Sequence, residues 1–317
     1  MKKAAILFLL ACTLIFTTAC LNKTDKDKTE SLLNPSSNDI SEDSAASSDE
    51  LTKTVESFLA DSSSSAPSSS SASSSTSKNL PGQPAPPKGS KAITLTFPEG
   101  FTLAQIGARL EAHNICKKAD FIKSTQTYNF SYYPLVKAIP PSSKRAYKLE
   151  GYLYPDTYTM YTHMRPQDAA GKFLRNAEQH ISGYSYSGMT TDQLVKLASV
   201  IERESNNSSD MKMVSSVFHN RLKKGQRLEA DSTRDYCTHY LLKPNGPFSD
   251  SFKYYYNTYR CAALPAGPIC NPGAAALNAA AHPASTDYLY FFTAKGKNYY
   301  QKTMAEHEKQ LKKFGMG

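Results

Sequence analysis

Hydrophobic and polar positions divide the chain into three parts. Residues 4–16 are almost entirely apolar, residues 21–91 are dominated by serine, and regular hydrophobic patterns begin only at residue 92. A serine-rich stretch with few aromatic residues cannot bury enough apolar surface to offset the entropy lost on ordering. Residues 21–91 are therefore predicted to be a disordered Ser/Pro-rich linker, and the packed body is expected in residues 92–317.

The first patterned segment, residues 92–147, predicts a strand followed by two helices. Residues 92–98 alternate apolar and polar side chains and are rich in β-branched residues, which favours a strand. Thr102 has the character of a helix N-cap, and apolar residues at helical spacing follow it to about residue 113. A second short helix is predicted over residues 118–125. This segment carries no catalytic constellation, so a packing subdomain is expected, with a small binding module as the alternative.

The rest of the body combines several helices with one pair of strands. Apolar residues recur at helical spacing in five places, at residues 165–179, 190–204, 209–222, 274–281 and 303–313. Residues 288–293 and 297–302 predict a β-hairpin, because Gly296 lies between them in a short turn. The body is therefore assigned to the α+β class.

The sequence LASVIERES, residues 197–205, places two glutamates at the end of one of these helices. The apolar face of this helix is formed by Leu194, Leu197, Ala198 and Ile201. With 3.6 residues per turn, Glu204 falls roughly 70° from the centre of that face, and Glu202 falls roughly 90° to the other side. The two carboxylates are therefore expected to meet different surroundings.

Glu204 is the candidate acid/base residue. It lies in the last turn of the predicted helix, where the helix dipole disfavours a negative charge. That field and partial burial would both raise the pKa of its carboxyl group and keep it protonated closer to neutral pH, as a general acid requires. The alternative interpretation is that Glu202 and Glu204 are both solvated residues at a helix end.

The N-terminus, residues 1–20, has the features of an export signal. Lys2 and Lys3 precede the apolar stretch, and small residues follow it up to Cys20. The last four residues resemble a bacterial lipobox with Cys20 as the lipidated residue, and an uncleaved single-span anchor is the other interpretation. Either anchor places the body on the extracytoplasmic face of a bacterial cell membrane. The net charge of +9 then favours an anionic membrane or wall polymer as a partner, and nucleic acid is excluded.

Four cysteines lie beyond the predicted signal, namely Cys116, Cys237, Cys261 and Cys270. Their spacings match no zinc-ligand pattern, and the sequence contains no other visible metal cluster. An extracytoplasmic location would permit disulfides. A bridge from Cys237 to either Cys261 or Cys270 and a set of free buried thiols are both compatible with the sequence.

Six motifs occur in order along the body. They are LEGYLYPDTY, ASVIERES, VFHNRLKKGQRLEADST, YNTY, LPAGPICNPG and AAAHPASTDYLYFFT. In this order they resemble the endolytic murein transglycosylases, a family of YceG-like proteins. The resemblance implies a small LysM-like strand-helix subdomain over residues 92–147, followed by a mixed α+β lytic transglycosylase domain over residues 148–317.

The resemblance also implies an activity and a set of site residues. Members of the family cut nascent peptidoglycan strands internally, between MurNAc and GlcNAc, and leave 1,6-anhydroMurNAc ends. The catalytic glutamate of the family is the second of the Glu-x-Glu pair, which corresponds to Glu204 here. Five further positions match family motifs and are expected to line the substrate cleft: Glu150, Asp231, Tyr256, Asn257 and Tyr259. The resemblance implies no metal and no cofactor, and it implies peptidoglycan strands and a peptidoglycan synthase as partners.

The chain departs from the family at its anchor and at two motif positions. Family members usually carry a membrane-spanning helix, whereas a lipid anchor and a serine-rich tether are predicted here. Ser232 and Ala266 stand where the family commonly has proline. These departures concern anchoring and partner docking more than the chemistry.

Two other functions fit part of the sequence. A muramidase-type hydrolase would use Glu204 as the acid and either Asp231 or Glu150 as a second carboxylate. A non-catalytic cell-wall-binding lipoprotein would need only the anchor, the tether and an aromatic-rich body. The nature of the cut ends distinguishes the first alternative, and the effect of Glu204→Gln on strand cutting distinguishes the second.

Overall fold

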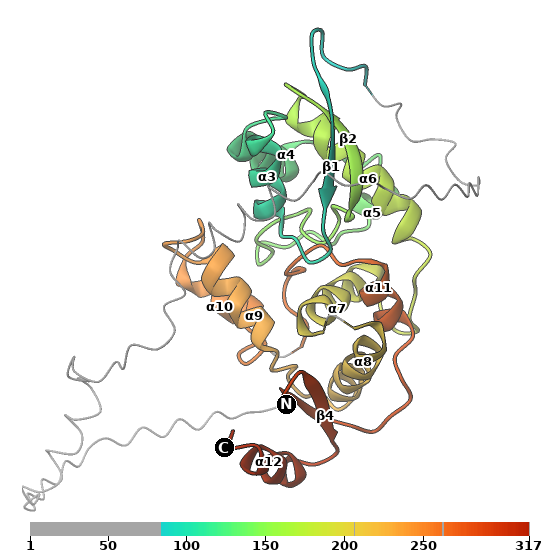
Figure 1. Cartoon of the computed structure of the whole chain (residues 1–317), viewed down its shortest axis with the longest axis vertical. Helices are drawn as coiled ribbons and strands as arrows, with labels where there is room; N and C mark the ends of the chain where they lie inside the picture. Colours follow the sequence, from blue (N-terminus) through green and yellow to red (C-terminus); the bar gives the residue numbers. More distant parts are fainter. Residues whose placement is uncertain (1–83, 206, 262, 317) are drawn as a thin grey trace, which may run out of the picture. The chain divides into compact units, whose positions relative to one another are not determined.

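The computed structural model describes residues 84–205, 207–261 and 263–316 (Figure 1). These residues belong to one unit of internal contacts, Ser74–Gly317. The predicted export signal, the lipidation site at Cys20 and most of the predicted linker lie outside the described residues. Within the described part of the chain, no helix is long and apolar enough to cross a membrane.

A two-stranded ribbon joins the first patterned segment to the sequence that follows it. Strand β1 (Ala92–Phe97) pairs antiparallel with β2 (Asp156–Tyr161), so the ladder crosses the predicted boundary at residue 147. Between the strands lie three helices, α3 (Leu103–Ala112), α4 (Lys118–Thr127) and α5 (Pro134–Lys137). A LysM-like identity for this segment stays a prediction.

Strand β2 begins at Asp156, in a stretch for which the sequence predicted no regular element. Tyr158 and Met160 are buried while Thr157 and Thr159 are exposed, and this alternation is the reason for the extended backbone. The strand lies within an aromatic-rich stretch, where its period of two is hard to recognise.

The ribbon packs on α6 (Pro166–His180) through aromatic side chains. The ring centroid of Phe97, at the end of β1, lies 4.8 Å from that of Phe173 in α6.

Helix α3 begins at the residue where the sequence predicted it. The Thr102 hydroxyl accepts a hydrogen bond from the Gln105 backbone N–H, and the Gln105 side chain accepts one from the Thr102 N–H. This capping box satisfies two N–H groups that would otherwise lack partners in the helix.

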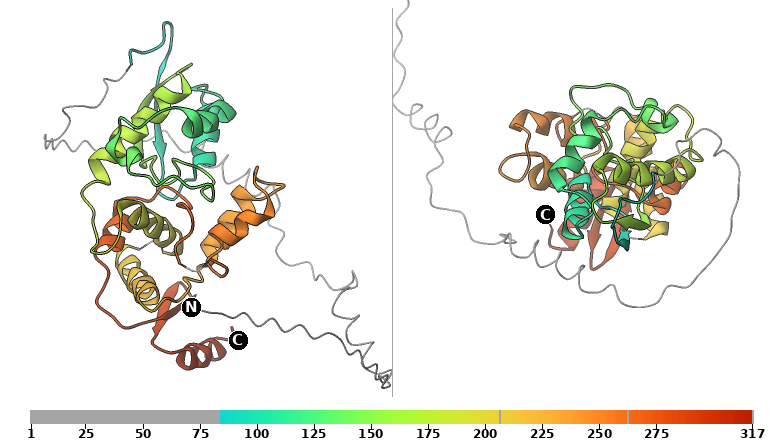
Figure 2. Two further views of the ribbon diagram at one scale, coloured as in Figure 1. Left: turned by 180° about the vertical axis from the view of Figure 1, so that it is seen from behind. Right: turned by 90° about the horizontal axis from the view of Figure 1, so that it is seen from above.

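Helices α7 (Thr191–Glu204), α8 (Ser208–Lys223) and α11 (Ala274–Ala281) pack against one another (Figures 1 and 2). The predicted apolar face of α7 is confirmed, since Leu194, Leu197, Ala198 and Ile201 are each at most 1% exposed. The small side chains of α11 allow its backbone to lie close to both neighbours. The buried His219 ring of α8 is 2.9 Å from the Ala280 carbonyl oxygen of α11.

Short helical segments follow α8, in the orange part of Figure 1. They are α9 (Asp231–Tyr236), the π-helical turn Cys237–Leu241, the 3₁₀ turn Asp250–Phe252 and α10 (Lys253–Tyr256). The sequence did not predict them, because three to six residues are too few to establish a helical period.

The chain ends in the predicted hairpin and helix. Strands β3 (Tyr290–Ala294) and β4 (Lys297–Gln301) pair antiparallel, and α12 (Met304–Lys313) follows them. Lys295 and Gly296 form the turn with φ of 51° and 70°, as a two-residue hairpin requires. The mixture of helices and small sheets confirms the α+β class. The four cysteines of the described residues are free thiols, which agrees with the second of the two alternatives that the sequence left open.

Candidate active site

Glu204 is the last residue of α7, and its carboxylate meets the first turn of α9. Its Oε1 accepts a hydrogen bond from the Ser232 backbone N–H at 3.2 Å. Burial raises the pKa of this half-buried carboxyl, hydrogen bonding from Ser232 opposes that increase, and the nearby carboxylates of Asp231 and Asp235 add to it. A carboxyl that holds its proton towards neutral pH can serve as a general acid.

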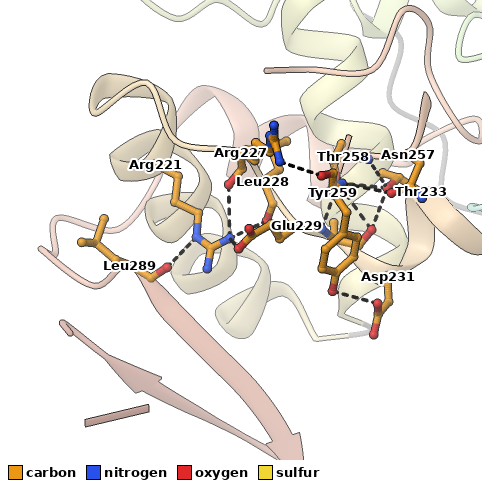
Figure 3. Close-up of polar contacts among 11 residues, drawn as sticks. Arg221, Arg227, Leu228, Glu229, Asp231, Thr233, Asn257, Thr258, Tyr259 and Leu289 are labelled. Carbon is orange, nitrogen blue, oxygen red and sulfur yellow. Dashed lines mark hydrogen bonds and ion pairs between the residues drawn. The ribbon is translucent and has the colours of Figure 1, made fainter. Parts of the chain in front are cut away.

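Hydrogen bonds to a second loop hold this turn of α9 in place (Figure 3). The Ala230 N–H donates to the Thr258 hydroxyl oxygen at 2.9 Å, and the Thr258 N–H donates to the Thr233 hydroxyl oxygen at 3.0 Å. Thr258 and Thr233 are both fully buried. The segment that carries the Glu204 partner is therefore fixed to the YNTY motif.

Asp231 and Tyr259 lie together at the exposed side of this arrangement. The Tyr259 hydroxyl donates to Asp231 Oδ1 at 2.9 Å, and Arg234 forms an ion pair with the same oxygen at 3.3 Å (Figure 3 shows the first contact). Burial, together with the hydrogen bond to Asp231, raises the pKa of Tyr259 to about 12. Asp231 directly precedes Ser232, whose N–H donates to Glu204, so the structure brings Glu204, Asp231 and Tyr259 into one cluster.

Asn257 shapes the loop that carries Tyr259. Its side-chain oxygen accepts a hydrogen bond from the Tyr259 N–H at 3.0 Å, and its backbone oxygen accepts from Arg260 and Cys261. The side chain is half-buried. Its side-chain amide therefore stabilises the turn that carries Tyr259.

Tyr256 and Glu150 are placed in the core, which corrects their predicted position in an open cleft. Tyr256 is 0% exposed, and its hydroxyl accepts a hydrogen bond from the Ala146 N–H at 2.9 Å. Glu150 is 1% exposed. Neither side chain can touch a substrate sugar from this position, because neither has a surface open to solvent.

Glu150 instead connects three separate parts of the fold. Its Oε1 accepts from the Leu103 N–H at the start of α3 and from the Asn271 side chain, and its Oε2 accepts from the Tyr236 hydroxyl of α9. Burial raises its pKa to about 7, although these hydrogen bonds oppose the increase. The next residue, Gly151, has a φ of 88° and lies so close to Pro268 that a Cβ atom would be 2.5 Å from the proline ring.

Glu202 has a structural role, in surroundings that differ from those of Glu204. Its Oε2 accepts a hydrogen bond from the Gly273 N–H at 3.0 Å, which joins the end of α7 to the start of α11. Burial raises the pKa of Glu202 to about 7, and the neighbouring Glu99 contributes to the increase. The two glutamates of the Glu-x-Glu pair therefore face different segments, Glu202 the start of α11 and Glu204 the start of α9.

The sequence did not identify Ser232 or Arg221 as parts of the site. The Ser232 backbone N–H contacts Glu204, and a pattern of side chains in the sequence cannot predict a backbone contact. Arg221 of α8 donates to the carbonyl oxygens of Leu228 and Leu289 at 2.8 and 2.6 Å and pairs with Glu229 (Figure 3). Arg221 therefore holds the chain leading into α9 against the start of the C-terminal hairpin. The sequence could not indicate this role, because an arginine near the end of a helix is usually exposed to solvent.

We expect Ser232→Pro to raise the pKa of Glu204 further. Proline has no N–H, and Ser232 lies in the first turn of α9, where the lost N–H makes no bond within the helix. Since the N–H stabilises the ionised carboxylate, its removal favours the protonated form. If Glu204 is a general acid, the alkaline limb of the pH–activity profile should move to higher pH.

Ser232→Ala is the matched control for this experiment, because it keeps the N–H and removes only the hydroxyl, which also lowers the pKa of Glu204. Its alkaline limb should move less far than that of Ser232→Pro, and the difference between the two variants measures the contribution of the N–H. Melting temperatures of both variants establish that α9 remains folded. An unchanged limb in Ser232→Pro would show that the N–H does not set the pKa of Glu204.

Comparison with known proteins places the chain in a family. The family model described as the YceG-like family matches residues 67–313. The match spans most of the chain, so the protein belongs to the YceG-like family, and the resemblance seen in the ordered motifs is confirmed.

Several relatives carry a functional name. The chain is 30% identical over 243 residues to the endolytic murein transglycosylase of Bacillus subtilis (strain 168), a match that covers 70% of this chain and 65% of the relative. It is 26% identical over 249 residues to the endolytic murein transglycosylase of Streptococcus pneumoniae (strain D39), covering 71% of this chain and 45% of the relative. The chain thus spans less than two thirds of the length of each of these relatives.

A solved structure shares the fold. The crystal structure of a YceG-like protein from Listeria monocytogenes superposes with a TM-score of 0.56 and 33% sequence identity. The match covers 68% of this chain and 74% of that chain. The arrangement of elements described above is therefore one that a member of the same family also adopts.

Proposed function

We propose that this protein is an endolytic peptidoglycan lytic transglycosylase. It cuts the MurNAc–GlcNAc bonds of nascent glycan strands and leaves 1,6-anhydroMurNAc ends. The observation that carries the proposal is the half-buried Glu204 carboxyl at the end of α7, which accepts a hydrogen bond from the Ser232 N–H and whose pKa is raised by burial. Glu204 is also the second glutamate of the Glu-x-Glu pair, on which the resemblance to the family places the catalytic residue. The names of the relatives support the same activity.

In the proposed mechanism, Glu204 acts first as an acid and then as a base. Its protonated carboxyl donates a proton to the oxygen that links MurNAc C1 to GlcNAc, and the C1–O bond breaks. The resulting carboxylate accepts the proton of the MurNAc C6 hydroxyl, whose oxygen forms a new bond to C1. No water is consumed, and Glu204 regains its starting protonation state. The nucleophile belongs to the substrate, so the attack is intramolecular and gains the advantage of proximity.

Asp231, Tyr259 and Asn257 are proposed to contact the sugar next to the cut bond. Asp231 and Tyr259 are exposed and hydrogen-bonded to each other, so their polar groups are already oriented before a substrate arrives. Buried Glu150 and Tyr256 are proposed to support the loops that carry these residues. The carboxylate of Asp231 would also help to keep Glu204 protonated.

A muramidase-type hydrolase is the second candidate, and Asp231 is the observation that favours it. Its carboxylate is exposed and close enough to raise the pKa of Glu204. A hydrolase needs a second carboxylate that activates water or attacks the sugar. Asp231 is already engaged by Tyr259 and Arg234, and buried Glu150 is closed to substrate, so the single-carboxylate mechanism fits the site better.

The deciding experiment is digestion of uncrosslinked glycan strands in H₂¹⁸O, followed by mass spectrometry of the new ends. A transglycosylase produces anhydro ends that are one water lighter than reducing ends and contain no ¹⁸O. Reducing ends labelled with ¹⁸O would establish the hydrolase and reject the proposed reaction. A known muramidase digested in parallel confirms that the label is detected.

We further propose that the protein is anchored on the extracytoplasmic face of the membrane, where peptidoglycan synthases supply nascent strands. The anchor is either a lipid on Cys20 or an uncleaved single span. Mass spectrometry of the N-terminal peptide separates the two, because a lipidated Cys20 would be the first residue of the mature chain. An N-terminus that begins beyond Cys20 would contradict both anchors.

A further inference from the structure

Helix α10 and the turn that follows it carry two exposed aromatic rings, one of which, Tyr259, belongs to the Glu204 site. Tyr254 is 53% exposed and Tyr259 is 41% exposed, whereas Tyr256 between them is 0% exposed. The buried Tyr256 hydroxyl accepts a hydrogen bond from the Ala146 N–H at 2.9 Å, which fixes the inner side of α10. The exposed rings therefore belong to a backbone that is anchored in the core.

Arg260 ends this turn, and its side chain lies over the ring of Tyr254. Its backbone N–H donates to the Asn257 carbonyl oxygen at 2.8 Å, which closes the turn. Its guanidinium carbon is 5.5 Å from the centroid of the Tyr254 ring. A guanidinium that stacks on an aromatic face keeps the N–H groups of its planar edge available to an acceptor. Tyr254 therefore orients a set of hydrogen-bond donors at the surface.

The charge of Arg260 is not neutralised by an acid. Among the described residues Arg260 forms no ion pair, and Arg227 adds a second guanidinium, which donates to the neutral Tyr259 carbonyl oxygen at 3.0 Å (Figure 3). The acids of the adjoining segments pair with other cations: Asp231 and Asp235 with Arg234, Glu229 with Arg221, and Asp250 with Lys253. The surface at Arg260 therefore keeps an excess of positive charge.

A carboxylate attached to the bound strand matches this arginine. Arginine binds carboxylates through two parallel N–H···O hydrogen bonds. Tyr259, the preceding residue, is proposed to contact the sugar next to the cut bond, and consecutive Cα atoms are only about 3.8 Å apart. Arg260 is therefore placed to meet a group that is attached to that sugar. In a peptide-bearing strand the lactyl carboxyl of MurNAc is joined to the peptide as an amide, so the free carboxylates belong to the peptides.

We propose that Arg260, oriented by Tyr254, is a subsite that binds a carboxylate of the stem peptide on a strand held at Glu204. The identity of the peptide rests on the proposed function. Neither residue takes part in the proton transfers. Their effect is on the choice of substrate, because strands with charged peptides are bound more tightly than strands with neutral peptides.

The test compares kcat/KM for the cutting of two batches of the same uncrosslinked, peptide-bearing strands by the full-length protein. In one batch the peptide carboxylates are free, and in the other they are converted to methylamides by carbodiimide coupling. Arg260→Gln should lower kcat/KM about five- to tenfold on the free carboxylates, mainly through KM, and leave the amidated strands within about twofold. Arg260→Lys should fall between, because lysine keeps the charge but not the planar pair of donors.

Two further positions control for net charge and for the ring. Arg165→Gln removes the same charge at the start of α6, where Asp168 pairs with the arginine at 2.7 Å, and should leave both rates unchanged. Tyr254→Ala should lower the rate on free carboxylates about threefold, because Arg260 loses the surface that orients it, whereas Tyr254→Phe keeps the ring and should resemble the unmodified protein.

Three results would overturn the inference. They are equal losses on the two kinds of strand in Arg260→Gln, unchanged rates on both, and a loss in Arg165→Gln as large as that in Arg260→Gln. Melting temperatures show that each variant is folded.

Binding measurements separate this outcome from that of the proposed reaction. Isothermal titration calorimetry of the same strands compares Glu204→Gln with Glu204→Gln/Arg260→Gln, neither of which needs to cut. Absence of cutting by the unmodified protein would reject the transglycosylase, yet weaker binding of the free-carboxylate strands by the double variant would still support the subsite. Conversely, anhydro ends together with unchanged rates in Arg260→Gln would support the transglycosylase and reject the subsite.

Discussion

Replacing Glu204 with glutamine should reduce strand cutting by about 10²–10⁴-fold, the range that a positioned acid/base group contributes. A loss near the upper end is expected, because in the proposed mechanism the same carboxyl donates one proton and accepts another. Glutamine can do neither. Its side-chain oxygen can still accept the hydrogen bond from the Ser232 N–H, so the end of α7 should remain as it is. Release of anhydro ends from uncrosslinked strands measures the effect.

Glu202→Gln is the matched control. It removes a carboxyl two residues earlier on the same helix, with a pKa that burial also raises. Its amide oxygen can replace Oε2 as the acceptor for the Gly273 N–H, and nothing in its position connects it with the substrate. Cutting should therefore stay within a few-fold of the unmodified protein. Near-normal cutting by Glu204→Gln, or a larger loss in Glu202→Gln, would mean that the acid/base has been assigned to the wrong glutamate.

The position of Glu204 could be predicted from the sequence because it depends on local periodicity. Four apolar residues of α7 defined its buried face, and the angle of each glutamate from that face followed from the helix pitch. The predicted direction of the Glu204 pKa was also right. The sequence could not show that burial is the main cause, because burial of Glu204 depends on α9 and its neighbours, which are distant in the sequence.

The environment of Glu150 and Tyr256 could not be predicted in the same way. Motif similarity marked both as important and suggested a cleft, but it could not distinguish a residue that touches substrate from one that holds loops together. The partners of Glu150 come from positions 103, 236 and 271. A buried carboxylate is tolerated only where several such donors converge, and no local pattern reveals that convergence.

Short helices and strands were also difficult to predict from the sequence. The pattern of residues 156–161 does alternate, but the strand is short, follows a proline and lies among many tyrosines, so it was not recognised from the sequence. Helix α9 spans six residues, and its start is fixed by Thr233 and Thr258, which lie 25 residues apart. Tertiary hydrogen bonds form these elements, whereas the longer helices α7 and α11 are specified by their own side chains.

Asp192→Asn should lower the free energy of unfolding by about 3–5 kcal/mol, the usual cost of removing one partner of a buried ion pair. In the fold, Asp192 is 3% exposed, and its two oxygens meet Arg145 Nη1 and Lys196 Nζ, each at 2.9 Å. The Tyr152 hydroxyl adds a hydrogen bond at 2.8 Å. Asparagine would leave two cations without a counter-charge, one of them the buried Arg145.

The pH dependence of this loss checks its electrostatic origin. Burial alone would raise the pKa of Asp192, but Arg145 and Lys196 outweigh it, and the pKa lies below its ordinary value. The stabilisation is therefore complete above the pKa of the unfolded chain and is lost as the pH falls through the lower pKa of the folded protein. In urea unfolding, the difference between the unmodified protein and Asp192→Asn should be large at pH 7 and should shrink in acid. Asp287→Asn, which removes an exposed ion pair with Lys302, should change stability little at either pH. A difference for Asp192→Asn that is the same at both pH values would point to lost packing or hydrogen bonding, and the charge cluster would then not be what stabilises the start of α7.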